Sequence, residues 1–485
     1  MLQFQLNVDH HESSKLFIIM SAAFLITSCS PDQPTPLTVH PENPHYFLFR
    51  GNPTVFIGST EHYGAVMNLD FDYVKYLDEL AACGMNITRT FSGVYVEPQK
   101  AFGILKNTMA PAPERYIAPW ARSPEPGYSN GGNRFDLNKW DEAYFTRLKD
   151  FIAEAGKRNI VVELDLFSCI YDTIQWKFSP LYYSNNINNT QIIRDWKEVL
   201  SLRHPELLAE QEKMVKKITS ELKDFDNLYY EVCNEPYFGD TTALREWEEY
   251  MTSVVADAEK DFELKHLISN NVQNFKKYLP EPRKHVSIYN FHYAEPPVTI
   301  PLNYHLNLPL GDNETGFRGI EGDIYRIEAW RFMLEGGALF NHLDYSFTTD
   351  NEDGTNVVQK GEPGGGSREL RNQFKLLADF MNSLNFISMK PVTDATVRPD
   401  VNGTSINGLE EEGKVWAFYL STKDTVQVTS TLEVNLPAGS YDIKWLDTKN
   451  GAEKSGQHNG HNGGWLQITS PEYLRDIAVK ITRKI

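Results

Sequence analysis

The stretch Leu228–Phe238, with the sequence LYYEVCNEPYF, decides the fold predicted for this chain. It begins as a short run of apolar and aromatic residues, which is the pattern of a buried parallel strand. Pro236 cannot continue a β ladder, so the strand ends before it and Glu235 stands at its carboxyl end. The alternative is that Asn234 and Glu235 belong to the start of a helix, where polar residues are also common.

The position of Glu235 predicts a chemical role. In a barrel of alternating strands and helices, the carboxyl ends of the strands carry the reactive groups. The aromatic residues beside Glu235 are expected to remove water from its carboxyl group, which raises the pKa and lets the group hold a proton near neutral pH. Glu235 is therefore expected to act as a general acid.

Seven further segments have the length and apolar content of buried strands, and helical patterns separate them. Strands that alternate with helices in this way are typical of the (β/α)8 TIM barrel, an α/β fold. Asp70 is expected to cap the first helix, and residues 136–158 to form an amphipathic helix after a long loop at 92–137. The eight predicted barrel strands lie at 54–58, 85–89, 160–167, 228–234, 266–270, 286–293, 308–317 and 338–347.

The length of 485 residues exceeds that of one ordinary core, so we expect two domains and an N-terminal tail. From about residue 391 the sequence changes to short alternating strands, such as 415–420 and 431–436, with turn residues between them. This pattern predicts a small antiparallel β-sandwich. The predicted order is a signal peptide at 1–29, a tether at 30–44, a barrel at 45–388 and a sandwich at 391–485.

The N-terminus carries the pattern of a secretion signal. The apolar run 16–25 is too short to span a bilayer and fits the hydrophobic part of a signal peptide. It ends in Ile26-Thr27-Ser28-Cys29, which resembles the lipobox of bacterial lipoproteins and implies lipidation of Cys29. The protein is then expected at the bacterial cell envelope, on the outer membrane or its periplasmic face. The alternative is an ordinary signal peptide in which Cys29 stands by chance.

The composition excludes some classes of binding partner. The net charge of -18 argues against nucleic acid and against anionic lipid surfaces, so membrane contact is expected only through the lipid anchor. The other three cysteines, Cys83, Cys169 and Cys233, have neither disulfide nor zinc spacing, and we predict no metal or cofactor. Abundant carboxylates and aromatic residues favour a neutral carbohydrate as the substrate.

A second carboxylate completes a candidate catalytic pair. Glu314 ends the seventh predicted strand as Glu235 ends the fourth, and in a closed parallel barrel both open on the same rim. One such group can protonate a leaving oxygen while the other attacks the anomeric carbon. Arg89 ends the second strand, where its charge needs a partner, and Tyr293 ends the sixth. We expect both to contact Glu314 and keep it ionised, as the nucleophile; a structural ion pair of Arg89 with a helix is the alternative.

These motifs resemble clan A retaining glycoside hydrolases, the cellulase-like (β/α)8 enzymes. The matching segments are Gly84–Arg89, Asn234-Glu235-Pro236, His292-Tyr293 and Glu314-Thr315-Gly316, in order on the second, fourth, sixth and seventh strands. The resemblance implies that Asn234 binds the 2-hydroxyl of the sugar and that Tyr293 bonds Glu314. Many clan members place a tryptophan after the eighth strand, and here Tyr345 or Phe347 would take that place.

Further side chains are expected to bind the substrate. Glu61 and His62 stand at the mouth of the first strand, and His292 at the end of the sixth. In the long loops, Trp120 and Trp176 are candidates for stacking on sugars, although Trp120 can equally pack its loop down.

The predicted function is cleavage of β-glycosidic bonds in an oligo- or polysaccharide, with retention by double displacement. Two alternatives stay open. One is a surface lipoprotein that binds glycans without cleaving them, and the other is a transglycosylase with the same residues.

Overall fold

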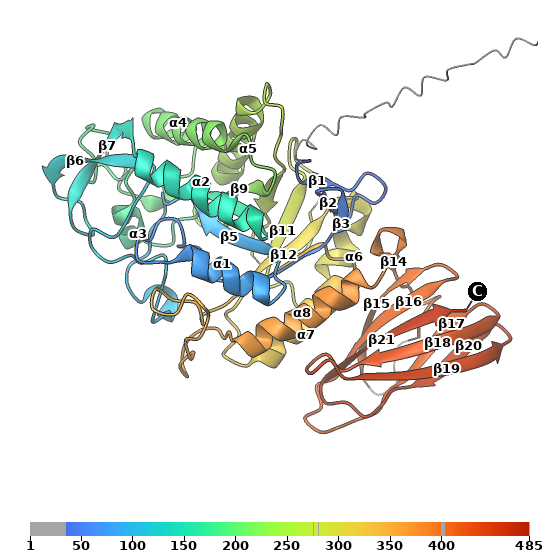
Figure 1. Ribbon diagram of the computed structural model, residues 1–485. Helices are drawn as coiled ribbons and strands as arrows, with labels where there is room; N and C mark the ends of the chain where they lie inside the picture. The colour runs from blue at the N-terminus through green and yellow to red at the C-terminus, as the bar shows by residue number, and fades with distance from the viewer. Residues whose placement is uncertain (1–34, 275, 280, 399–402, 485) are drawn as a thin grey trace, which may run out of the picture. The chain divides into compact units, whose positions relative to one another are not determined.

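The computed structural model describes residues 35–274, 276–279, 281–398 and 403–484 (Figure 1). The predicted signal peptide, its Cys29 and the first part of the tether lie outside the described residues. Among the described helices, none is long and apolar enough to cross a membrane.

Eight parallel strands form the central sheet, in the order β4-β13-β12-β11-β10-β9-β8-β5. The two strands at the ends of this order are also joined. The backbone N–H of Asn86 donates to the carbonyl of Ile57 (3.3 Å), and the Asn86 side chain accepts from the Ile57 N–H (2.9 Å). The predicted barrel is therefore confirmed. Its strands are β4 Phe56–Thr60, β5 Ile87–Phe91, β8 Val161–Ser168, β9 Leu228–Asn234, β10 Ile268–Asn271, β11 Ile288–His292, β12 Leu310–Thr315 and β13 Leu339–Leu343.

Helices cover the outside of the barrel (Figure 1). Each of the longer ones buries one apolar face against the strands, as the periodicity of the sequence predicts. The helices are α1 Tyr73–Ala82, α2 Glu142–Lys157, α3 Thr173–Phe178, α4 Pro205–Leu222, α5 Thr241–Ala258, α6 Thr299–Asn303, α7 Gly322–Leu334 and α8 Arg368–Asn382.

Two helix starts differ from the prediction. Asp72, not Asp70, caps α1, because its side chain accepts the N–H groups of Val74 and Lys75. Asp70 instead pairs with Arg115. The second predicted helix begins six residues late, at Glu142, because the long loop before it is partly a β-hairpin of β6 (Trp120–Pro126) and β7 (Asn133–Trp140).

Antiparallel sheets flank the barrel in sequence. Before it lie β1 Thr38–Val39, β2 Phe47–Phe49 and β3 Asn52–Thr54. After it, a six-stranded sheet and a two-stranded one bury a separate apolar core, which confirms the predicted sandwich. The strands of the larger sheet, in spatial order, are β14 Lys390–Pro391, β15 Ser405–Glu411, β16 Val415–Ser421, β21 Asp476–Arg483, β18 Gly439–Leu446 and β19 Glu453–His461, and the smaller sheet pairs β17 Thr431–Leu436 with β20 Gly464–Thr469.

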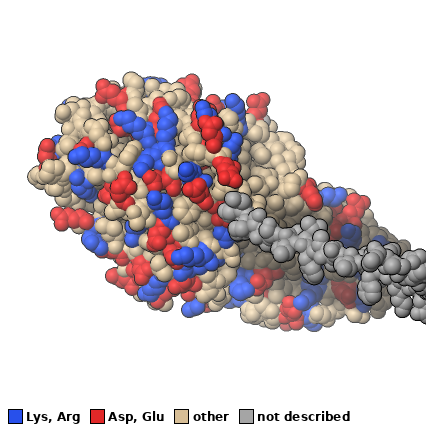
Figure 2. Space-filling model, turned by 45° about the horizontal axis from the view of Figure 1, so that its top comes forward, with Lys and Arg blue, Asp and Glu red and all other residues tan. Residues whose placement is uncertain are grey.

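Charged side chains cover the surface in mixed order. Figure 2 shows acidic and basic residues interspersed over the face in view. Many exposed charges are paired along helices, as Lys216 is with Glu212 on α4 (2.9 Å). Such pairs contribute little to stability because water and salt screen them.

A buried ion pair joins the sandwich to the barrel. Arg326 on α7 is 1% exposed, and its Nη2 lies 2.6 Å from Oδ1 of Asp476 on β21. Its Nε donates to the other carboxylate oxygen (3.1 Å), so the pair is bidentate. Beside it, the rings of Trp330 and Tyr419 stack with centroids 5.5 Å apart. The contact is thus both ionic and apolar.

Replacing Asp476 by asparagine is expected to lower the free energy of unfolding by about 3 kcal/mol, because Arg326 is then left buried with less compensation. Urea unfolding followed by circular dichroism measures the loss. The matched control is Glu453→Gln, which removes an exposed partner of Lys444 and should cost less than about 1 kcal/mol. Equal losses in the two variants would contradict the role given to the buried pair.

Candidate active site

A cavity of about 660 Å³ opens where the barrel strands end. Glu235 and Glu314 both line it, together with many aromatic side chains. Glu235 directly follows β9, and Glu314 lies near the end of β12. A cavity of this size, with a few polar groups converging among aromatic walls, is typical of a ligand site.

Four side chains surround the carboxylate of Glu235, which is 7% exposed. The hydroxyl groups of Tyr171 and Tyr237 donate to Oε2, at 2.6 and 2.7 Å. The amide of Asn274 donates to Oε1 (2.6 Å), and Nδ1 of His292 lies 3.0 Å from the same oxygen. Each carboxylate oxygen of Glu235 therefore has two side-chain partners.

This environment corrects the predicted pKa of Glu235. Burial does raise the pKa, as expected, but the hydrogen bond and the charge of His292 and the donors Tyr171 and Asn274 outweigh it and lower the pKa to about 2. Burial lowers the pKa of His292, and Glu314 and Glu235 more than reverse that effect, so the pKa of His292 is raised. The two shifts run in opposite directions and favour the proton on His292 over Glu235.

Glu314 also accepts from two tyrosines, but its third donor is a guanidinium. Arg89 Nη1 donates to Oε2 (2.9 Å), as does the hydroxyl of Tyr63 (2.9 Å), while Tyr293 donates to Oε1 (2.8 Å). The predicted contacts of Arg89 and Tyr293 with Glu314 are thus present in the structure. Because a guanidinium can only donate, Glu314 faces Arg89 as an acceptor.

The two glutamates lie close together around His292. One carboxylate oxygen of Glu235, one of Glu314 and one ring nitrogen of His292 are all within 4.8 Å of one another. The register of β11 and β12 shifts between Phe291 and His292, and this irregularity brings His292 opposite Glu314. Irregular strand ends often redirect side chains into a site in this way.

Three site residues have a left-handed backbone conformation, which is unfavourable for residues other than glycine. The φ angles are 56° for Tyr63, 49° for Glu235 and 56° for Tyr293. Each such residue costs on the order of 1 kcal/mol and persists only when its surroundings fix it. All three touch a carboxylate of the pair or carry one, so the strain is concentrated at the site.

Arg89 also occupies the centre of a second acidic cluster inside the barrel. Its guanidinium lies 2.7 to 2.9 Å from Asp165, Glu231 and Glu163. The three carboxylates are close enough together to hold a metal ion. Here the charge of Arg89 stands among them, so the alternative of an ion pair with a helix is wrong. Burial, followed by the nearby Glu231, raises the pKa of Glu163 to about 7.

Two predicted sugar-stacking residues are structural. Trp120 is fully buried and stacks on Trp140 of the same hairpin, with centroids 6.1 Å apart. Trp176 is 2% exposed, and its Nε1 donates to the carbonyl of Ile193 (2.8 Å). Neither lines the cavity. These predictions are wrong because both loops fold back and bury their own tryptophans.

Of the other predicted substrate-binding residues, some line the cavity and others do not. His62 and Asn234 line the cavity, whereas the fully buried Glu61 does not and instead accepts the N–H groups of Gly64 (3.0 Å) and Ala65 (2.9 Å). Asn234 accepts from Arg89 (2.8 Å), beside the two glutamates.

No ring after the eighth strand reaches the cavity wall among the described residues. Tyr345 is 4% exposed and lies behind Phe317, with centroids 6.2 Å apart. Phe347 packs under Arg371, whose guanidinium carbon lies 4.4 Å from the ring centre. The place expected for Tyr345 is taken by Phe317 of the loop after β12, which lines the cavity.

Four residues that contact Glu235 or Glu314 were not among the predicted site residues. Tyr63 and Tyr237 stand within two residues of predicted ones, so their position was a usable signal. Tyr171 and Asn274 lie in loops after β8 and β10, and only the general rule that barrel-strand ends carry function points to them.

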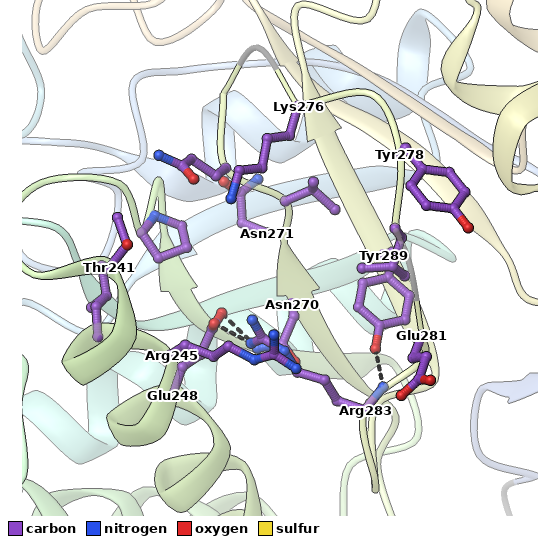
Figure 3. Close-up of a pocket in the computed structure, with 15 residues that line it drawn as sticks. Thr241, Arg245, Glu248, Asn270, Asn271, Lys276, Tyr278, Glu281, Arg283 and Tyr289 are labelled. Carbon is purple, nitrogen blue, oxygen red and sulfur yellow. Dashed lines mark hydrogen bonds and ion pairs between the residues drawn. The ribbon is translucent and has the colours of Figure 1, made fainter.

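A second cavity, of about 150 Å³, lies beside α5 (Figure 3). There Glu248 pairs with Arg283 and accepts from Asn270 (2.7 Å). Burial raises the pKa of Glu248. Glu248 and Arg283 are thus paired with each other, and neither Glu235 nor Glu314 lines this cavity.

Comparison with known proteins places this site in a context. The family model "Cellulase (glycosyl hydrolase family 5)" matches residues 75–293, a range that includes Glu235 and His292 and ends before Glu314. The search of curated proteins found no match.

Solved structures share the fold. A protein described as a glycoside hydrolase superposes with a TM-score of 0.61 at 12% identity, over 93% of this chain and 97% of its own. A glycoside hydrolase family 5 protein from Bacteroides vulgatus ATCC 8482 superposes with a TM-score of 0.60 at 12% identity, over 92% of this chain and 93% of its own. At 12% identity these structures show only that the fold is shared, while the family match over residues 75–293 indicates a glycosidase, an enzyme that hydrolyses O-glycosyl bonds.

Proposed function

We propose that the protein hydrolyses β-glycosidic bonds of an oligo- or polysaccharide, with retention of anomeric configuration by double displacement. The observation that carries this proposal is the approach of Glu235 and Glu314 to within 4.8 Å through one oxygen each. Retaining enzymes hold their two carboxyl groups about 5 Å apart, whereas inverting enzymes separate them by about 6.5–9.5 Å to admit a water. The spacing here supports retention.

The surroundings of the two groups support different roles. Glu314 is fixed by Arg89, Tyr63 and Tyr293, which leaves it oriented as the nucleophile. Glu235 shares a proton with His292, 3.0 Å away, and is suited to give and take a proton.

The reaction then has two steps. In the first, an oxygen of Glu314 bonds to the anomeric carbon, the glycosidic bond breaks, and the leaving oxygen takes the proton from Glu235, which His292 supplies. In the second, a water attacks the anomeric carbon and its proton passes to Glu235. The ester to Glu314 breaks, the proton on Glu235 returns to His292, and both carboxyl groups are again in their starting states.

We also propose that the protein is anchored at the bacterial cell envelope by a lipid on Cys29. The proposal rests on the lipobox-like sequence that ends at this residue. It places hydrolysis outside the cytoplasm, where polysaccharides are available.

Replacement of Glu314 by glutamine is expected to reduce kcat by several orders of magnitude, because an amide cannot form the glycosyl ester. The measurement is a screen of 4-nitrophenyl β-glycosides of glucose, mannose, xylose and galactose, and of their β-1,4-linked di- and trisaccharides. Activity like that of the unmodified protein in Glu314→Gln would refute the assignment.

The matched variant is Glu235→Ala. It should keep the attack step on a substrate with a good leaving group, and added azide should restore part of the turnover by attacking the glycosyl ester. If azide does not increase the turnover of Glu235→Ala, the general acid is a different residue.

His292→Gln is expected to move the alkaline limb of the kcat/KM profile to lower pH. In the unmodified protein the pair loses its last proton mainly from His292, whose pKa is raised above 6.5. With glutamine at position 292, Glu235 alone must hold that proton. One site binds a proton less tightly than two sites that share it, so the proton is lost at lower pH. An alkaline limb at the same pH in both proteins would show that the pair does not supply the proton.

Cys29→Ser is expected to release the protein from the membrane fraction of bacterial cells, because the thiol that carries the lipid is lost. Fractionation and immunoblotting measure this distribution. Ser28→Ala, which keeps a small residue before Cys29, is the control and should leave the protein in the membrane fraction. Retention of Cys29→Ser would contradict the anchor.

A further inference from the structure

An aromatic side chain bridges the mouth of the cavity. Phe102, in the loop after β5, lines the cavity and is 43% exposed. Its ring centroid lies 5.2 Å from that of Tyr171 and 6.5 Å from that of Phe317, edge to face in both cases. Such contacts are favourable arrangements for aromatic pairs.

The two partners of Phe102 belong to opposite sides of the barrel. Tyr171 follows β8 and Phe317 follows β12. In the order of the closed sheet, β9, β10 and β11 separate these strands on one side, and β13, β4 and β5 separate them on the other. A ring that contacts both therefore spans the mouth from side to side.

The loop that carries Phe102 is tied down at both ends. At its start, the N–H of Glu97 donates to the carbonyl of Met109 (3.0 Å), and Nε2 of His62 lies 3.2 Å from the Glu97 carboxylate. At its end, the side chain of Asn68 donates to the carbonyl of Thr108 (2.9 Å).

Close packing adds to these ties. A Cβ on Gly64 would lie 2.3 Å from the carbonyl oxygen of Thr108, so only glycine fits there. Glu61 accepts from the hydroxyl of the same threonine. The loop that carries Phe102 is therefore held in place by the segment after β4. Glu61 and His62 fix the position of this loop rather than serving as a pair of sugar-binding residues.

The wall beside Glu314 is closed as well. His62 stacks on Tyr63, with ring centroids 5.5 Å apart, and Tyr63 donates to Glu314. Met109, 1% exposed, completes this wall. The leaving group departs on the side of Glu235, which gives it the proton, so the sugar that becomes bound to Glu314 extends toward the closed wall.

We propose that the site is specific for chain ends: it admits the non-reducing end of a β-linked saccharide beneath Phe102 and releases sugar from that end. A long chain cannot be laid across the mouth from above, because Phe102 spans it. The inference rests on the proposed function and specifies its mode of action as exo rather than endo.

The test compares free and blocked chain ends. The probes are the 4-nitrophenyl β-trisaccharides of the four sugars above, each with and without a 4-O-benzyl ether on the non-reducing terminal sugar. The unmodified protein should cleave at least one free trisaccharide and release terminal sugar from it, while its blocked form reacts at least about tenfold more slowly, as expected for a steric contact in a shaped pocket.

Phe102→Ala should narrow that ratio by about tenfold by opening the mouth, and Phe102→Trp should keep it. Leu105→Ala is the matched control, because Leu105 is exposed on the same loop and does not line the cavity. It should leave both rates unchanged.

Each result decides one claim. Equal cleavage of blocked and free trisaccharides by the unmodified protein overturns the exo inference and leaves the proposed function standing. Release of sugar from the reducing end alone also overturns it. Cleavage of none of the free trisaccharides overturns the proposed function, and the inference with it.

Discussion

The burial of one guanidinium is the constraint on which the structure depends. Arg89 is 1% exposed and within 2.9 Å of four carboxylates, of which Asp165, Glu163 and Glu231 lie inside the barrel and Glu314 at its mouth. A buried charge is tolerated only when it is paired and hydrogen-bonded, and the same is true of each carboxylate. The interior of the barrel and Glu314 are therefore held by one side chain, and neither can be rearranged alone.

The distribution of protons follows from this arrangement. Near the pair of glutamates, Arg89 is committed to four carboxylates, whereas Nδ1 of His292 lies 3.0 Å from Glu235. His292 is thus the group placed to give a proton to Glu235. Its pKa is raised because two carboxylates face it, and the pKa of Glu235 is lowered because His292 faces back. A substrate oxygen entering beside Glu235 would draw on this shared proton rather than on an acid protonated in advance.

The fold was readable from the sequence because strands and helices have different apolar periods, and all eight barrel strands fall within the predicted segments or within three residues of them. Glu235 and Glu314 were readable because each ends a strand. The errors lie where long-range packing decides. Trp120 was judged from its place in a loop, but a hairpin partner buries it. The pKa of Glu235 was judged from its neighbours in sequence, but three of its four hydrogen-bond partners come from other loops or strands.

The loop after β5 shows a second limit of prediction from sequence: the place of a residue can be predicted correctly while its role is not. Glu61 and His62 stand at a strand end, which correctly marked them as part of the mouth. Sequence position cannot tell a residue that binds a ligand from one that holds the wall of its pocket, because both need polar groups at the rim. Here the partner of each decides: Glu61 accepts from backbone N–H groups, and His62 pairs with Glu97 at the base of the Phe102 loop. Their polar groups therefore fix the shape of the mouth of the cavity that the two glutamates line.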